Sequence, residues 1–111
     1  MAGPIETFFF AWGAPDERRD AILAEALAEG AVYEDPRGRA QGVPAITDYV
    51  AQFLATAPGG AAEVVETSEG ADGATEVRVR FHGSGFEHFG RYEAQLDGDG
   101  RILRMSGVRD G

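Results

Sequence analysis

The residues best suited to chemistry in this chain lie in the short segment Tyr33-Glu34-Asp35-Pro36. The segment follows an Ala-rich helical stretch and precedes a glycine and another helical stretch, so we expect Asp35 where an apolar strand leaves a layer of helices. A carboxylate walled by aromatic side chains loses hydration, which disfavours its charged form and suits it to exchange protons with a ligand. An aspartate before a proline is also an ordinary turn residue, because its carboxylate caps nearby backbone donors. Asp35 is therefore a candidate general base, with a turn residue as the alternative.

The length and composition restrict the possible functions. With 111 residues the chain is expected to form one domain, residues 1–111, with one core and room for one small cavity. Its formal net charge of -9 repels phosphate backbones and anionic lipid headgroups, so neither nucleic acid nor a membrane is an expected partner. The sequence has no Cys and no Lys, which excludes thiol nucleophiles, thiolate metal sites and lysine Schiff bases. The aromatic run at residues 8–10 lacks a basic flank and the length to span a bilayer, which favours a soluble cytoplasmic protein.

Apolar residues with a helical period predict three helices in the first half of the sequence. Glycine and proline are expected to end these helices at Gly13, at Gly30 and at Pro58, and a short strand is expected at residues 31–34. The first helix is too apolar on one face to be exposed. That face carries Ile5, Phe8, Phe9 and Trp12.

After residue 60 the apolar period changes to two, which predicts an antiparallel meander. A two-residue turn at residues 84–85 would place Phe81 opposite His88 and Val77 opposite Tyr92, because opposite residues of a hairpin share a face. The other histidine, at position 82, would then face the opposite side, which argues against a metal site between the two. The four strands are expected at residues 63–68, 75–83, 86–96 and 101–109.

A second two-residue turn, at residues 98–99, would extend the same apolar face. This register pairs Tyr92 with Met105 and Ala94 with Leu103. It leaves Ile102 on the outer face, together with Phe89 of the preceding strand. An exposed apolar outer face of this kind, near arginine pairs, favours a homodimer. Three helices followed by a curved meander form an α+β architecture, in which the helices cover the apolar face of the sheet.

This order of elements resembles the NTF2-like superfamily of cone-shaped (cystatin-like) domains. The resemblance is carried by the aromatic first helix, by the Ala31-to-Pro36 segment and by the Gly42-x-x-Ala45-Ile46 start of the third helix. It spans nearly the whole chain and implies three N-terminal helices packed on a curved, mostly antiparallel sheet. It is closest to the SnoaL-like polyketide cyclases and the ketosteroid isomerases, whose strand before the third helix also carries Glu-Asp-Pro.

The resemblance implies roles for individual residues. Asp35 falls on the position of the isomerases' general base, which moves a proton between carbons. Phe8 falls on the position of a tyrosine oxyanion donor and has no hydroxyl, whereas Tyr92 falls on the position of the neutral aspartate donor. His88 is a second donor or an alternative base, since its ordinary pKa is about 6.5. A strand tyrosine that sends its hydroxyl to water and a strand histidine bonded to a backbone carbonyl are the alternatives.

The function implied is that of an isomerase or cyclase that needs no cofactor and no metal and moves a proton on a small apolar carbonyl compound. Aromatic and apolar side chains are expected to line the cavity, although helical aromatics are also ordinary core residues. The alternative is a non-catalytic ligand-binding or dimerisation module, whose outer sheet face bears Arg78, Arg80 and Arg91. Epoxide hydrolysis ranks third, because the sequence predicts no second inward carboxylate. The expected lining residues are Phe8, Trp12, Tyr33, Tyr49, Phe53, Phe81 and Met105.

Overall fold

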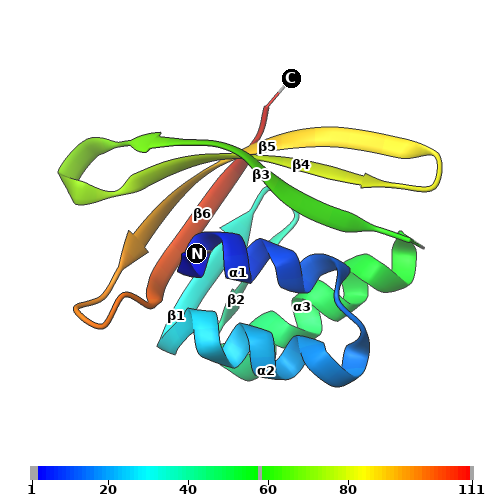
Figure 1. Cartoon of the computed structure of the whole chain (residues 1–111), viewed down its shortest axis with the longest axis horizontal. Helices are drawn as coiled ribbons and strands as arrows, with labels where there is room; N and C mark the ends of the chain where they lie inside the picture. The colour runs from blue at the N-terminus through cyan, green and yellow to red at the C-terminus, as the bar shows by residue number, and fades with distance from the viewer. Residues whose placement is uncertain (1–2, 58, 111) are drawn as a thin grey trace.

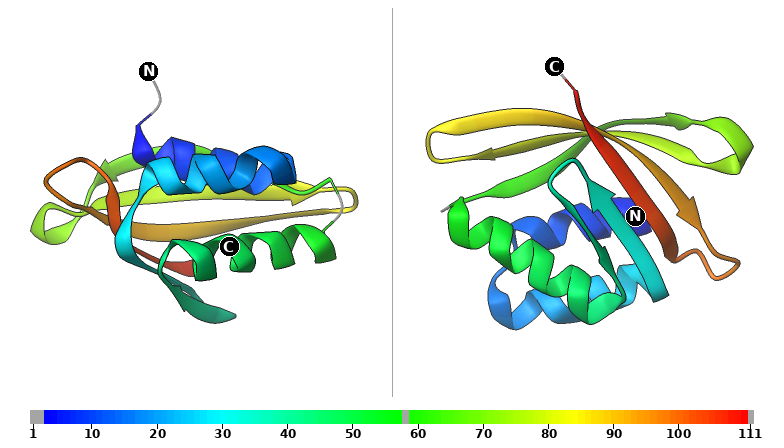
Figure 2. Two further views of the ribbon diagram at one scale, coloured as in Figure 1. Left: turned by 90° about the horizontal axis from the view of Figure 1, so that it is seen from below. Right: turned by 180° about the vertical axis from the view of Figure 1, so that it is seen from behind.

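The computed structural model describes residues 3–57 and 59–110, and within them three α-helices cover the inner side of a curved six-stranded sheet (Figure 1). Two views from other sides show the same layers (Figure 2). No helix in the described part of the chain is long and apolar enough to cross a membrane. The helices are α1 (Pro4–Phe10), α2 (Asp16–Ala26) and α3 (Val43–Thr56), with 3-10 turns at Ala11–Gly13 and Ala71–Gly73. The strands are β1 (Leu27–Asp35), β2 (Gly38–Gln41), β3 (Ala61–Glu69), β4 (Thr75–Gly83), β5 (Phe86–Leu96) and β6 (Ile102–Asp110).

The sheet has the strand order β2-β1-β6-β5-β4-β3. Every neighbouring pair is antiparallel except β1 and β6, which run parallel. The predicted α+β architecture of three helices on a curved, mostly antiparallel sheet is therefore confirmed. The parallel pair lies in the middle of the sheet and brings the end of β1 beside the middle of β6, where Tyr33 lies opposite Met105.

The first helix packs as its sequence predicts. Pro4 occupies the first turn, where a missing N–H costs no hydrogen bond, and the Glu6 carboxylate reaches back to the backbone at the helix start. Phe8, Phe9 and Trp12 are fully buried, and their rings meet one another at centroid distances of 4.9–6.1 Å. Burying three large aromatic side chains contributes several kcal/mol, because each removes about 150–250 Å² from water. This cluster fills the deep part of the cone.

The second helix is shorter than predicted. It ends at Ala26 instead of Gly30, and Leu27 already belongs to β1. Gly30 has a φ of 75°, in the left-handed region, and lies where the pairing of β1 with β6 shifts register between Leu27 and Val32. The glycine therefore forms a bulge inside a strand rather than a helix end. The short strand β2 that follows was not predicted, since four residues show no clear alternation.

The hairpin of β4 and β5 has the predicted register. Phe81 lies opposite His88 and Val77 lies opposite Tyr92. Because His82 pairs with Glu87, the two histidines face opposite sides of the hairpin, as the sequence predicts. The first hairpin therefore places His88 and Tyr92 on the inner face together with the aromatic core.

The predicted register of the second hairpin is wrong. Tyr92 lies opposite Gly107 instead of Met105, and Ala94 lies opposite Met105 instead of Leu103. The cause is a loop longer than two residues, in which the carboxylate at position 97 accepts hydrogen bonds from two loop N–H groups, followed by a register shift between residues 95 and 96.

This shift exchanges the faces of two apolar residues. Ile102, expected on the outer face, is fully buried, whereas Leu103, expected inside, is 44% exposed. Met105 keeps its inner position because its pairing moves by two residues, which preserves the face.

Candidate functional site

The candidate site is built on the turn that joins β1 to β2. Asp35 is the last residue of β1, and its Oδ1 accepts hydrogen bonds from the backbone N–H groups of Arg37 at 2.9 Å and Gly38 at 3.2 Å. The side chain is 5% exposed. Asp35 is thus a turn-capping residue and, at the same time, a carboxylate largely shielded from water.

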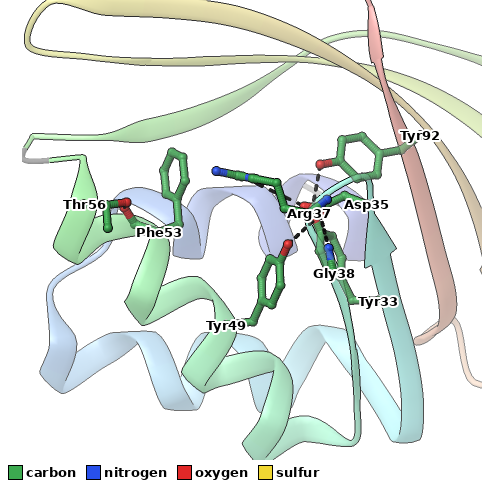
Figure 3. Close-up of polar contacts among 8 residues, drawn as sticks. All are labelled: Tyr33, Asp35, Arg37, Gly38, Tyr49, Phe53, Thr56 and Tyr92. Atoms are coloured by element: carbon green, nitrogen blue, oxygen red, sulfur yellow. Dashed lines mark hydrogen bonds and ion pairs between the residues drawn. The ribbon is translucent and has the colours of Figure 1, made fainter.

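All three tyrosines of the chain join this carboxylate in one hydrogen-bonded network (Figure 3). Tyr49 of α3 donates to Oδ1 of Asp35 at 2.5 Å, and Tyr33 of β1 donates to Oδ2 at 2.7 Å. The Tyr33 hydroxyl also lies 2.8 Å from the hydroxyl of Tyr92 on β5. Tyr33 and Asp35 are two residues apart on one strand and therefore share a face, which explains their contact.

The direction of these hydrogen bonds follows from counting protons. An ionised carboxylate only accepts, so the single hydrogen of Tyr33 goes to Asp35. The bond between the two tyrosines must then be donated by Tyr92. On the carboxylate, Oδ1 accepts from three donors and Oδ2 from one, so Oδ2 is the oxygen with a free lone pair for a ligand proton.

The tyrosines of the network stay protonated. Burial raises the pKa of Tyr33 well above its ordinary value, and the neighbouring Tyr92 and Asp35 raise it further. Burial is also the largest cause that raises the pKa of Tyr92, while the hydrogen bond to Tyr33 opposes it. The pKa of Tyr49 is raised by burial and by its bond to Asp35. The three hydroxyls are therefore neutral donors over the whole working range of pH.

Alkaline titration tests this network directly, because the chain contains no tyrosine outside it. Tyrosine in an unfolded chain ionises near pH about 10. Since the folded pKa values are raised, we expect no tyrosinate absorbance until the protein unfolds, and the free energy of unfolding should fall as the pH rises above about 10. The measurement is near-ultraviolet absorbance followed together with circular dichroism. A tyrosine that ionises reversibly near its ordinary value in the folded protein would contradict the network.

A pocket of about 190 Å³ opens beside Asp35. His88 lies on its wall with its ring stacked on Phe81, at a centroid distance of 5.1 Å. Burial lowers the pKa of His88, and the nearby cations Arg109 and Arg37 lower it further, so the imidazole is neutral at neutral pH. The lining residues are Asp35, Pro36, Arg37, Phe81, His88, Phe89, Gly90, Tyr92, Val108 and Arg109.

The structure therefore brings four of the candidate residues together at this pocket, namely Asp35, Tyr92, His88 and Phe81. Two further candidates, Tyr49 and Phe53, line a neighbouring pocket of about 220 Å³. The remaining four do not line either pocket, because they pack in the fully buried core: Phe8, Trp12, Tyr33 and Met105. The aromatic face of α1 fills the depth of the cone, so the open space lies near its mouth.

Two arginines of the site were not found from the sequence. Arg37 lines both pockets, and its guanidinium lies over the Phe53 ring at 5.6 Å and 4.0 Å from Oδ2 of Asp35. Arg109 belongs to β6 and lies opposite Gly90 on the pocket wall. The position of Arg37 two residues after the candidate base was a usable signal, whereas the position of Arg109 depends on the register of the second hairpin.

Gly107 is a further residue that the sequence did not indicate. The Tyr92 ring packs directly on its backbone: a Cβ at position 107 would lie 2.7 Å from Cζ of Tyr92 and would overlap other ring atoms. Only glycine leaves room for the ring there, and the ring position sets the hydroxyl 2.8 Å from Tyr33. Gly107 is therefore a positioning residue for Tyr92.

The geometry of this site can be compared with known proteins. The family model described as "SnoaL-like domain" matches residues 5–108. This chain belongs to the SnoaL-like family. The SnoaL-like fold is also seen in its structural neighbours, whereas no curated protein matches the chain.

Three solved structures illustrate this likeness. A candidate isomerase of the SnoaL-like family from Agrobacterium tumefaciens has a TM-score of 0.86 and 26% identity, over 97% of this chain and 95% of that one. A candidate polyketide cyclase from Sinorhizobium meliloti has a TM-score of 0.76 and 28% identity, over 96% and 94% of the two chains. A candidate ketosteroid isomerase from Kribbella flavida has a TM-score of 0.73 over 97% and 76%, and at 20% identity it supports the fold alone.

Proposed function

We propose that this SnoaL-like protein is a cofactor-independent isomerase or cyclase that moves a proton on a small, largely apolar carbonyl compound. The observation that carries the proposal is a shielded carboxylate, Asp35, at the wall of a pocket that also presents the hydroxyl-bearing Tyr92 and the neutral imidazole of His88. The names of the structural neighbours, an isomerase candidate and a cyclase candidate, agree with this class of reaction.

The proposed reaction begins with removal of a proton from the carbon next to the ligand carbonyl. Oδ2 of Asp35 accepts the proton, and the electron pair of the broken C–H bond moves to the carbonyl oxygen to give an enolate. Tyr92 turns its hydrogen from Tyr33 to this oxygen, and His88 is placed to donate a second hydrogen bond. An isomerase then returns the proton to another carbon, whereas a cyclase uses the enolate carbon as the nucleophile.

Tyr33 and Tyr49 act as positioning residues in this proposal. Each donates to one oxygen of Asp35, and the two bonds fix the carboxylate relative to the pocket. Tyr33 is fully buried and Tyr49 is partly buried, which limits the access of water to these bonds and holds the carboxylate in one orientation.

The activity is tested with 2-tetralone, a neutral ketone with acidic protons between its carbonyl and its ring. In D₂O buffer the protein should accelerate deuterium incorporation at this carbon, followed by proton NMR. Tyr92→Phe removes the hydroxyl and should slow the catalysed exchange about a hundredfold, the usual effect of losing one oxyanion donor. A rate equal to that in buffer alone would refute the activity, and equal rates for wild type and Tyr92→Phe would refute the role of the hydroxyl.

A non-catalytic ligand-binding protein is the second candidate, and one feature of the network favours it. The hydrogen of Tyr92 is already donated to Tyr33, and Oδ1 of Asp35 has all its acceptor capacity occupied by protein donors. A pure binding protein would show NMR shift changes of His88 on addition of 2-tetralone and no exchange above buffer, which separates it from the enzyme.

A further inference from the structure

The pocket carries the opposite charge to the protein as a whole. The chain has 19 acidic residues and 10 arginines, with a formal net charge of -9. Among the described residues that line the pocket, however, there are two arginines, Arg37 and Arg109, one carboxylate, Asp35, and a neutral His88. A local excess of cations in an acidic protein indicates that the site binds an anionic ligand.

The carboxylate of Asp35 does not account for these cations. Its oxygens already accept from two tyrosine hydroxyls and two backbone N–H groups, and the Arg37 guanidinium comes no closer than 4.0 Å. That ion pair is the single one that Arg37 forms with described side chains, and Arg109 forms none with the side chains of residues 3–57 and 59–109. Both guanidiniums therefore keep donors available for a ligand.

The two arginines occupy the rim rather than the floor of the pocket. The Arg37 side chain is 58% exposed and extends from the Asp35 turn toward Phe53 (Figure 3). Arg109 is exposed and lies opposite Gly90, which has no side chain, and both residues line the same pocket as Arg37. The stacked rings of Phe81 and His88 form an apolar wall further in. A ligand that fits has an apolar body and an anionic end at the rim.

We infer that the ligand of this pocket is a carbonyl compound that also carries a carboxylate, a small oxo acid, which Arg37 and Arg109 bind at the rim. The carbonyl part of this inference rests on the proposed function, whereas the carboxylate part rests on the two arginines alone. Guanidinium groups suit a carboxylate because they can donate two parallel hydrogen bonds to its two oxygens.

The test compares two probes of the same shape, 4-acetylbenzoate and its uncharged amide 4-acetylbenzamide, by isothermal titration calorimetry. The acid should bind at least about tenfold more tightly than the amide. Added salt should lower the affinity for the acid and leave the affinity for the amide unchanged. Arg37→Gln and Arg109→Gln should each remove most of this preference. Arg39→Gln is the matched control, because Arg39 is exposed on β2 and does not line the pocket, and it should keep the preference.

Three results would overturn the inference: equal affinities for the two probes, no measurable binding of the acid at millimolar concentration, or an unchanged preference in both arginine variants. Asp35→Asn separates this inference from the proposed function. That variant should bind the acid at least as tightly as wild type, because it lacks a negative charge beside the pocket, even though it should not exchange protons. A preference for the acid without exchange activity would refute the enzyme and leave the anion site in place.

Discussion

Gly107→Ala is expected to lower the midpoint of thermal unfolding by about 10 °C, through a free-energy loss of about 1–3 kcal/mol. The added methyl group would overlap the ring of Tyr92, which is 5% exposed and packed against Phe9 and Phe81. The ring cannot move inward, so it must shift along the sheet and give up its hydrogen bond to Tyr33. The variant should also let Tyr92 ionise at lower pH than in wild type, which the tyrosine titration would detect.

Gly98→Ala is the matched control for this substitution. Gly98 lies in the β5–β6 loop, its added Cβ would meet no atom within 4 Å, and its φ is not in the left-handed region. Its unfolding midpoint should stay within about 3 °C of wild type. If Gly107→Ala unfolds at the same midpoint as the control and shows no tyrosinate absorbance at high pH before it unfolds, the contact between residue 107 and Tyr92 does not position the network.

The sequence was sufficient for the parts of the fold that depend on local periodicity. The aromatic face of α1, the start of α3 and the register of the β4–β5 hairpin follow from patterns within about 15 residues, and the structure confirms them. For the same reason His88 and Tyr92 could be placed on one inner face in advance. Asp35 was identified by its place between a strand and a turn.

The predictions that were wrong or missing depend on single-residue register shifts and on contacts between distant elements. The longer β5–β6 loop and the register shift at residue 103 within β6 together moved the partner of Tyr92 from Met105 to Gly107, and neither could be read from the alternation of Leu103 and its neighbours. The contribution of Arg109 to the pocket depends on the same register. The hydrogen bond of Tyr49 to Asp35 joins α3 to the end of β1, so it could not follow from local pattern, whereas Tyr33 lies two residues before Asp35 on the same strand.

Asp35→Asn should remove catalysis while leaving the fold intact. The amide oxygen can keep the three donors at the Oδ1 position, and the amide NH₂ at the Oδ2 position can donate to Tyr33, whose hydrogen then turns to Tyr92. Because the network reverses direction without losing a bond, we expect a stability change below about 1 kcal/mol. The amide cannot accept a proton at that position, so the rate should fall about a thousandfold or more.

Glu34→Gln is the matched control for that variant. Glu34 is the adjacent residue, it points to the other side of β1, and it pairs with Arg104 at 2.6 Å outside the pocket. It removes the same charge without touching the network, so its exchange rate should equal that of wild type.

Deuterium incorporation into 2-tetralone by wild type, Asp35→Asn and Glu34→Gln is the measurement that decides whether Asp35 is the base. We expect exchange well above buffer for wild type and Glu34→Gln, and exchange at the buffer rate for a folded Asp35→Asn. Undiminished exchange in Asp35→Asn would contradict the assignment of the base.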